Sequence, residues 1–404
     1  MAKIVESLKK LSVENSVCNG NIHNDRMLKK KNNFILAREE ILSDNDNYAL
    51  VVCGTQNDPE FRVAAALSDN SCVVYSIGES ISHTTTLIHN ESSIIGMKFS
   101  SSSKNILYMG TSDGIITVCD LRAKGRVIAE FKDNSDDGKL KPLTSFDISC
   151  DDKLLAGGTE HIGGDAFILF WDIRHSNSKA NSKNNVLGGY WESHMDDITS
   201  LSFHSTKKDT LASGSTDGLI NIFDLTQTSE DAALSYSLNT ESSVDRIGWL
   251  NDDSLWCTTH THCLQLWNCD GATPYGNFNR SSVGACQNED PDSCYLVRVH
   301  SSNVFSHPFL IGGSSTAKGE HLRCLNIVND SLDCCNIMLD NKQTVRDSWL
   351  HEKSACLITI GEGSLLNIWK PTDSPIIQQS AGHKLTAKMN SGKGRDKHHR
   401  TKPY

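Results

Sequence analysis

The run HMDDITSLSFHSTKKDTLASGSTDGLINIFD, from His194 to Asp224, has the clearest strand pattern in the chain. It contains three strand-like segments, 198–203, 210–215 and 219–224, and the turn pair Asp217-Gly218 separates the last two. Apolar residues that alternate on both sides of an Asp-Gly pair are the strongest short-range signal of a β-hairpin. The run therefore predicts three consecutive antiparallel strands.

Units of the same kind recur along the chain and can be aligned on one position near the end of their third strand. The successive gaps between these positions are 44, 52, 52, 44, 58 and 44 residues. A period near 44 with insertions matches the roughly 40–45 residues of a four-stranded propeller blade. Seven such positions predict seven blades, and they are Tyr75, Cys119, Trp171, Phe223, Trp267, Leu325 and Trp369.

The polar residues of the units resemble the signature of the WD-repeat family, in which a His, a Ser or Thr, an Asp and a Trp-Asp pair recur. Trp171-Asp172 is a true Trp-Asp pair, whereas the units around 70–75 and 311–326 match least. The resemblance covers about 34–370. It implies an all-β fold, a seven-bladed β-propeller of four-stranded antiparallel blades. It also implies structural roles for His194, Ser213, Asp217, Phe223, Asp224, Asp113, Trp171, Asp172, Trp267 and Trp369.

The stability of each predicted blade depends on its neighbours, because a single small sheet with two apolar faces is not stable alone. Packing the blades into a ring buries both faces of each one. Ring closure commonly uses an N-terminal strand in the last blade, and 34–42 is the candidate. We therefore expect a flexible segment 1–33, a propeller over 34–370 and a basic, disordered tail 371–404. The insertions 132–141, 176–185 and 271–292 are rich in Asn, Ser, Gly or Asp, so we expect surface loops there.

The charge is distributed unevenly along the 404 residues. The net charge is −10, but the segment 380–404 alone carries +6, which leaves −16 on the rest of the chain. An acidic body argues against nonspecific nucleic-acid binding by the whole chain. Three roles stay open for the basic tail, namely contact with RNA, binding of a nuclear import receptor, or only solubilising the chain. The chain shows no signal peptide or membrane-length apolar run, and its 14 cysteines form no regular framework. We expect an intracellular protein, cytoplasmic, nuclear or both.

Two groups of residues have the residue types of a catalytic site or of a metal site, but neither has the accompanying motif. His194, Ser213 and Asp217 have the residue types of a catalytic triad, but no Gly-x-Ser-x-Gly motif accompanies them. The metal-like group Cys257, His260, His262, Cys263 and Cys269 lacks the paired C-x₂-C spacing of zinc sites. No phosphate-binding glycine motif is present either. The sequence thus predicts no enzyme, no metal, no cofactor and no small-molecule substrate.

The resemblance instead implies binding at one rim of the propeller, beside the residue that opens each first strand and just before the turn Asp. We expect a scaffold for partner proteins that acts as a monomer within a larger complex. The alternative is a subunit of a nuclear ribonucleoprotein or ribosome-assembly complex whose tail contacts RNA. The candidate rim residues are Ser93, Ile95, Ser112, Pro142, Thr144, Asp197, Thr199, Thr216, Asp245, Thr344 and Arg346.

Overall fold

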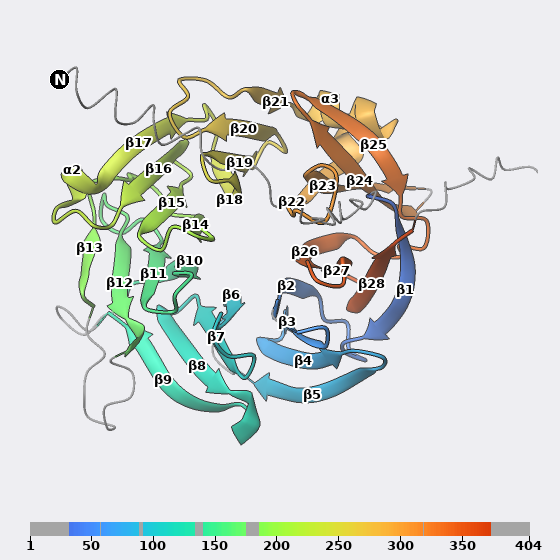
Figure 1. Cartoon of the computed structure of the whole chain (residues 1–404), viewed down its shortest axis with the longest axis horizontal. Helices are drawn as coiled ribbons and strands as arrows, with labels where there is room; N and C mark the ends of the chain where they lie inside the picture. Colours follow the sequence, from blue (N-terminus) through green and yellow to red (C-terminus); the bar gives the residue numbers. More distant parts are fainter. Residues whose placement is uncertain are drawn as a thin grey trace, which may run out of the picture. The chain divides into compact units, whose positions relative to one another are not determined.

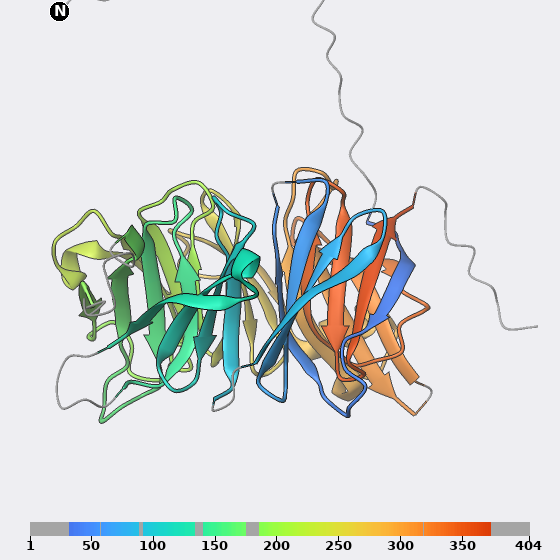
Figure 2. The ribbon, with the colours of Figure 1, turned by 90° about the horizontal axis from the view of Figure 1, so that it is seen from below.

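The computed structural model describes residues 32–56, 58–88, 92–133, 140–174, 186–317 and 319–372. These residues form seven four-stranded antiparallel sheets that follow one another around a central axis (Figure 1). The predicted seven-bladed β-propeller is therefore confirmed. In each blade the strands run between the two faces of the ring (Figure 2).

Blades 1 to 6 each use four consecutive strands, which pair in chain order from the axis outward. The first three blades contain β2 (Ala49–Gly54), β3 (Phe61–Leu67), β4 (Ser71–Ile77), β5 (Ile81–Ile88), β6 (Ile94–Phe99), β7 (Ile106–Thr111), β8 (Ile115–Asp120), β9 (Arg126–Lys132), β10 (Leu143–Ile148), β11 (Leu154–Thr159), β12 (Ile168–Asp172) and β13 (Gly188–Tyr190).

Blades 4 to 6 repeat this arrangement, with short helices in the connections. Their strands are β14 (Ser200–Phe203), β15 (Thr210–Gly214), β16 (Leu219–Asp224), β17 (Leu234–Asn239), β18 (Val244–Asn251), β19 (Ser254–Thr259), β20 (Leu264–Asn268), β21 (Gly276–Phe278), β22 (Cys294–His300), β23 (Phe309–Thr316), β24 (Gly319–Val328) and β25 (Ser331–Ile337). Their helices are α2 (Glu230–Ala233), α3 (Arg280–Gln287) and the 3-10 turn η3 (Pro291–Ser293), while a further 3-10 turn, η1 (Leu121–Ala123), lies in blade 2.

Blade 7 closes the ring with strands from both ends of the propeller. It contains β26 (Val345–His351), β27 (Cys356–Gly361), β28 (Leu365–Pro371) and, outermost, β1 (Phe34–Ile41). The register pairs Phe34 with Pro371 and Ile41 with Leu365. The closing strand predicted at 34–42 is therefore confirmed.

All seven alignment positions lie in the third strand of their blades, as predicted. Each pairs with an aliphatic residue of the second strand that has no exposed surface, as in Leu211 opposite Phe223 and Leu357 opposite Trp369. At the Asp217-Gly218 turn, Gly218 has φ +87°. Glycine adopts this backbone conformation without the steric penalty of a side chain.

The hydrophobic core is divided among the interfaces between blades. Seven buried clusters occur, and each combines residues of two neighbouring blades, including one across the junction of blades 7 and 1. Every blade therefore depends on both neighbours for burial of its apolar faces.

The prediction of a surface loop at 271–292 is wrong. This segment contains β21, the outer strand of blade 5, followed by α3 and η3. Val283 and Gln287 of α3 are buried, and Val283 belongs to the cluster between blades 5 and 6. The Asn- and Gly-rich composition reflects the turns and the Asn279 N-cap, and it obscured the two elements between them.

Closure by β1 suggests a first test. Phe34 is 1% exposed and its ring centroid lies 5.6 Å from that of Phe305 and 5.5 Å from that of Phe309. We expect Phe34→Ala to lower the free energy of unfolding by about 3–5 kcal/mol, because it leaves a cavity in this cluster. Urea denaturation measures the change.

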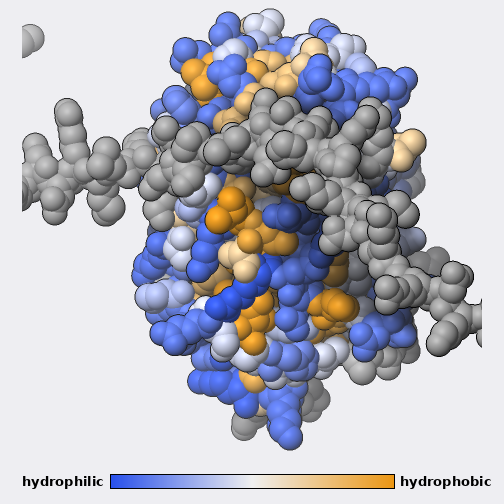
Figure 3. Space-filling model, turned by 90° about the vertical axis from the view of Figure 1, so that its right-hand side faces the viewer, coloured by the Kyte–Doolittle hydropathy of each residue, from blue (hydrophilic) through white to orange (hydrophobic). Residues whose placement is uncertain are grey.

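The neighbouring residue provides the control. Ile35, on the outermost strand of blade 7, is 51% exposed. Seen from the side in Figure 3, the surface carries apolar residues scattered among polar ones. Ile35→Ala should cost less than about 1 kcal/mol. Equal losses in the two variants would contradict the closing role of Phe34.

Candidate functional site

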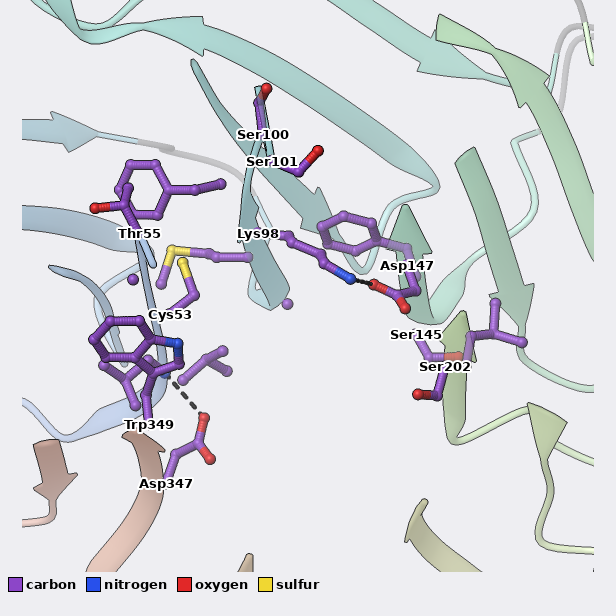
Figure 4. A pocket seen from close by; sticks show the side chains of 18 of the residues that line it. Cys53, Thr55, Lys98, Ser100, Ser101, Ser145, Asp147, Ser202, Asp347 and Trp349 are labelled. Atoms are coloured by element: carbon purple, nitrogen blue, oxygen red, sulfur yellow. Dashed lines mark hydrogen bonds and ion pairs between the residues drawn. The ribbon is translucent and has the colours of Figure 1, made fainter. Parts of the chain in front are cut away.

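The innermost strands of all seven blades surround a cavity of about 910 Å³ on the propeller axis (Figure 4). Five charged residues of these strands line it, and three are Arg246, Arg298 and Asp347. Each of these three follows a register shift near the start of its strand, at Val244/Arg246, Leu296/Arg298 and Val345/Asp347. Such bulges re-aim the side chain that follows them.

The other two charged residues, Lys98 and Asp147, form an ion pair between blades 2 and 3 (Figure 4). The second carboxylate oxygen of Asp147 accepts a hydrogen bond from the backbone N–H of Phe203 in blade 4, at 2.7 Å. One carboxylate thus joins three consecutive blades. The Lys98 side chain is 43% exposed, so its charge remains hydrated.

Asp347 connects four blades through one buried carboxylate. Its Oδ1 lies 2.9 Å from Arg246 Nη1 in blade 5 and 3.3 Å from Arg298 Nη2 in blade 6. Its Oδ2 accepts from the backbone N–H of Val52 in blade 1 at 3.0 Å. Burial would raise the pKa of Asp347, but the two guanidinium groups and the backbone N–H donors outweigh it and lower the pKa.

The two arginines differ in how well Asp347 compensates them. Burial would lower the pKa of both, and Asp347 with Asp245 opposes this. For Arg246, which donates a hydrogen bond to Asp347, the pKa is raised. For Arg298, burial prevails and the pKa is lowered. Arg298 is therefore the less completely paired of the two.

His300 is a buried neutral group next to this cluster. Its Nε2 lies 2.8 Å from the Ser348 hydroxyl, and its ring packs against Phe309. Burial, followed by the charge of Arg298, lowers the pKa of His300 to about 3. The imidazole is thus neutral near pH 7.

The triad-like residues form a hydrogen-bonded chain inside blade 4. His194 Nδ1 lies 3.0 Å from Asp217 Oδ2, and His194 Nε2 lies 2.6 Å from Ser213 Oγ. Ser213 has no exposed surface and His194 is 2% exposed. Burial raises the pKa of Asp217, but hydrogen bonds from His194 and backbone N–H groups outweigh it and lower the pKa. This chain ties the turn to the blade, and no substrate can reach its hydroxyl.

In blades 7, 5 and 2, other residues make the hydrogen bonds that the His-Ser-Asp chain makes in blade 4. Trp369 Nε1 donates to Thr359 Oγ1 at 2.9 Å, and Trp267 Nε1 donates to Gln265 Oε1 at 3.0 Å. In blade 2, Asp113 Oδ1 accepts from Thr111 Oγ1 at 2.5 Å. The buried polar groups are thus paired without the histidine.

The third strands of blades 2, 3 and 4 each end on an aspartate that makes the same hydrogen bond. Asp120, Asp172 and Asp224 each accept a hydrogen bond from the backbone N–H two residues later, at 2.9, 2.9 and 3.0 Å. Asp120 and Asp172 also form ion pairs with Arg122 and Arg174. The Asp of the Trp-Asp pair therefore caps the turn that leaves the strand.

The candidate rim residues lie at the face where the innermost strands begin, which we call the rim face. In five blades, one backbone N–H after the second strand donates to the carbonyl just before the innermost strand, each at 3.0 Å. These donor–acceptor pairs are Ser112–Ser93, Glu160–Pro142, Thr216–Asp197, His260–Ser243 and Glu362–Thr344. The repeated bond places six of the eleven candidates, Ser93, Ser112, Pro142, Asp197, Thr216 and Thr344, around one face.

The side chains of the candidate rim residues differ in their exposure and in their hydrogen bonds. Ser93 and Arg346 are exposed, and the other nine are half-buried. The Thr144 hydroxyl donates to the Ile198 carbonyl at 2.6 Å, and that of Thr199 donates to the Val244 carbonyl at 2.8 Å. These two hydroxyls link neighbouring blades. Asp245 accepts from Thr258 Oγ1 at 3.1 Å, and Arg346 forms an ion pair with Glu362. Ile95, Thr144 and Thr199 also line the cavity.

Sequence reasoning missed the charged residues of the cavity. A signal was present, because each charge interrupts the apolar pattern of an innermost strand. Arg246 and Asp347 stand third from the opening residue of their strands, and Lys98, Asp147 and Arg298 stand fifth. Their convergence depends on ring closure, which brings strands about a hundred residues apart into contact.

The expectations of no metal site and no membrane span can be compared only with the residues that the structure describes. The structure describes the Cys257–Cys269 region, and among its described residues no group of three or more His, Cys, Asp or Glu could hold a metal ion. No helix in the described ranges is long and apolar enough to span a membrane. The basic tail 380–404, with its predicted RNA contact, lies outside the described residues.

The Asp347 network suggests a stability test. Asp347→Asn removes the charge that both guanidinium groups face, and we expect it to lower the free energy of unfolding by about 3 kcal/mol. Urea midpoints and slopes measure the loss. Asp253→Asn, at a side chain that is 89% exposed, should change stability by less than about 0.5 kcal/mol. A comparable loss in both would show that Asp347 does not hold the blades together.

His300 predicts a pH dependence. The folded-state pKa is about 3 against an ordinary value of 6.5, so below pH 6.5 the unfolded chain takes up a proton that the folded chain does not. Stability should fall with pH in this range, by up to about 1.4 kcal/mol per pH unit. His300→Gln should make the stability curve less steep between about pH 6.5 and 4. His83→Gln, at an exposed histidine, should leave the slope unchanged; an unaltered slope in His300→Gln contradicts the assignment.

Comparison with known proteins agrees with the blade structure. No protein-family model matches the chain. WD repeat-containing protein GTS1 of Arabidopsis thaliana is 30% identical to it over 249 residues, which are 59% of this chain and 58% of that protein. An uncharacterized WD repeat-containing protein of Saccharomyces cerevisiae is 33% identical over 293 residues, 71% of this chain and 69% of that protein.

A third relative is the WD repeat-containing protein 89 homolog of Dictyostelium discoideum. It is 26% identical over 220 residues, which are 52% of this chain and 59% of that protein. The segments 157–174 and 194–224 are the parts that most resemble WD repeat-containing protein 89. The chain thus spans less than two thirds of the length of the first and third relatives. Seven blades with the Trp-Asp positions in their third strands, together with the yeast relative, show that the chain belongs to the family of WD repeat-containing proteins.

Proposed function

We propose that the chain is a non-catalytic scaffold that holds partner proteins on the rim face of its propeller. One observation carries the proposal, namely the backbone hydrogen bond that recurs at the rim face in five blades. It fixes short loops of different sequence at equivalent positions around one ring. A rigid ring that presents variable loops suits the recognition of a folded partner.

The hydrogen bonds and burial of the triad-like residues support a role in binding over one in catalysis. The triad-like side chains of blade 4 are consumed by internal hydrogen bonds, and Ser213 is fully buried. An activated nucleophile needs access to a substrate and a nearby oxyanion site. The names of the relatives state WD repeats and no activity.

The exposed rim residues define where a partner would bind first. Ser93 lies in blade 2 and Arg346 in blade 7, and both are exposed. Arginine is enriched among residues that dominate binding energy, and Arg346 forms an ion pair with Glu362 at this face. We infer that one copy of the chain joins a larger complex through this arc of the rim face.

Site-specific photo-cross-linking tests the proposal. A photoreactive amino acid is placed at Ser93, at Arg346 or at Lys208, whose exposed side chain lies in the turn between β14 and β15 on the opposite face. In cells, the two rim positions should form adducts with the same protein, because one partner would span both sites. Lys208 should not form this adduct.

Variants of the same positions measure the strength of the contact. Arg346→Glu should weaken binding of the cross-linked protein about 5- to 30-fold, equivalent to about 1–2 kcal/mol, while Lys208→Glu leaves it unchanged. Both substitutions change the charge by the same amount. Adducts that form equally from both faces, or binding that depends on neither rim residue, would refute the proposal.

A further inference from the structure

We propose that the axial cavity contains a binding site for an oxyanion, a carboxylate or phosphoryl group, held by Arg298 with Arg246. This site is separate from the rim contacts and needs no partner on them. It lies on the innermost strands of blades 5 and 6, and both side chains line the cavity.

The first support is the unused hydrogen-bonding capacity of Arg298. A guanidinium group has several N–H donors arranged to match a carboxylate or a phosphate. Among the described residues, no hydrogen bond involves the Arg298 side chain, whose nearest carboxylate oxygen, Asp347 Oδ1, is 3.3 Å away. Arg246 donates one hydrogen bond, from Nη1 to the same oxygen. Most donors of the pair therefore have no acceptor among the described residues, and both side chains line the cavity.

The second support is that Asp347 is shared among several donors. Its two oxygens accept from Arg246 and from the backbone N–H groups of Val52 and Ser348, and its side chain is 1% exposed. Arg298 meets only Oδ1 of this carboxylate, at 3.3 Å, and that oxygen already accepts from Arg246 and Ser348. The other N–H donors of Arg298 are therefore available to an acceptor in the cavity.

The electrostatic surroundings agree with an under-paired guanidinium. Asp347 and Asp245 both attract Arg298, yet burial still lowers the pKa of this side chain. The local charges nearly cancel, so attraction at long range is weak. Recognition would instead come from short, charge-assisted hydrogen bonds to the oxyanion.

The cavity has the size and lining that such a ligand requires. Its volume of about 910 Å³ lies in the range of small-molecule sites. Lys98 and Asp147 occupy another part of the wall and neutralise each other (Figure 4). The Arg298 and Arg246 side chains are 32% and 29% exposed, so a ligand in the cavity can reach them.

Titration with inorganic phosphate at constant ionic strength, followed by calorimetry, tests the site in the full chain. Constant ionic strength removes general screening effects. Wild type should bind with a saturable isotherm, and Arg298→Gln should weaken binding at least about tenfold. Arg298→Lys keeps the charge without the planar group and should give an intermediate affinity. Lys208→Gln removes the same charge at an exposed position and should bind as wild type.

A hexaglutamate peptide provides the second arm, because a carboxylate of a partner protein has the same chemistry as a free anion. Binding of phosphate alone assigns a small free anion, and binding of the peptide with the same dependence on Arg298 assigns an acidic segment. If Arg298→Gln fails to fold, Arg246→Gln should show the same loss. Equal affinity of wild type and the folded arginine variant for both probes, including no binding by either, would overturn the site.

This outcome is independent of the rim proposal. Loss of phosphate binding with intact Ser93 and Arg346 cross-links would remove the cavity site alone. Loss of the cross-links with intact phosphate binding would remove the rim scaffold alone.

Discussion

The pairing of β1 with β28 is the constraint on which the other parts of this structure depend. Each hydrophobic cluster combines residues of two neighbouring blades, so an open ring would leave apolar faces exposed at both ends. Phe34 at the start of β1 packs into the cluster between blades 6 and 7, and Leu36 packs against the same cluster. One N-terminal strand thereby completes the last sheet and joins the two ends of the propeller without a covalent bond.

Closure also creates the polar centre of the molecule. Asp347 of the last blade accepts a backbone N–H of Val52 in the first and faces arginines of blades 5 and 6. A buried carboxylate without these partners would be costly, so the network favours one arrangement of four blades. The hydrogen-bonded chain of blade 4 serves a similar purpose within a single blade, where His194 joins Asp217 to Ser213. Polar groups therefore fix the geometry at two scales, within one blade and between blades.

Much of the fold could be predicted because its signals are local. Strand alternation, the Asp-Gly turn and the repeat of about 44 residues specify blades, and all seven alignment positions lie in third strands. The segment 271–292 was misread because turn-forming residues at its ends concealed a three-residue strand and an eight-residue helix. The helix contributes Val283 to a contact with residues far away in sequence, which short-range patterns do not reveal.

The sequence by itself determined the strands, their turns and the number of blades, because these follow from residue types within a few positions of one another. The resemblance to WD repeats also implied which polar residues are structural. Only the tertiary structure decided which charges meet on the axis, since Arg246, Arg298 and Asp347 belong to separate blades. It likewise decided which rim side chains are exposed and which hydroxyls bond a neighbouring blade. These properties arise from contacts between blades, and such contacts exist only once the ring is closed.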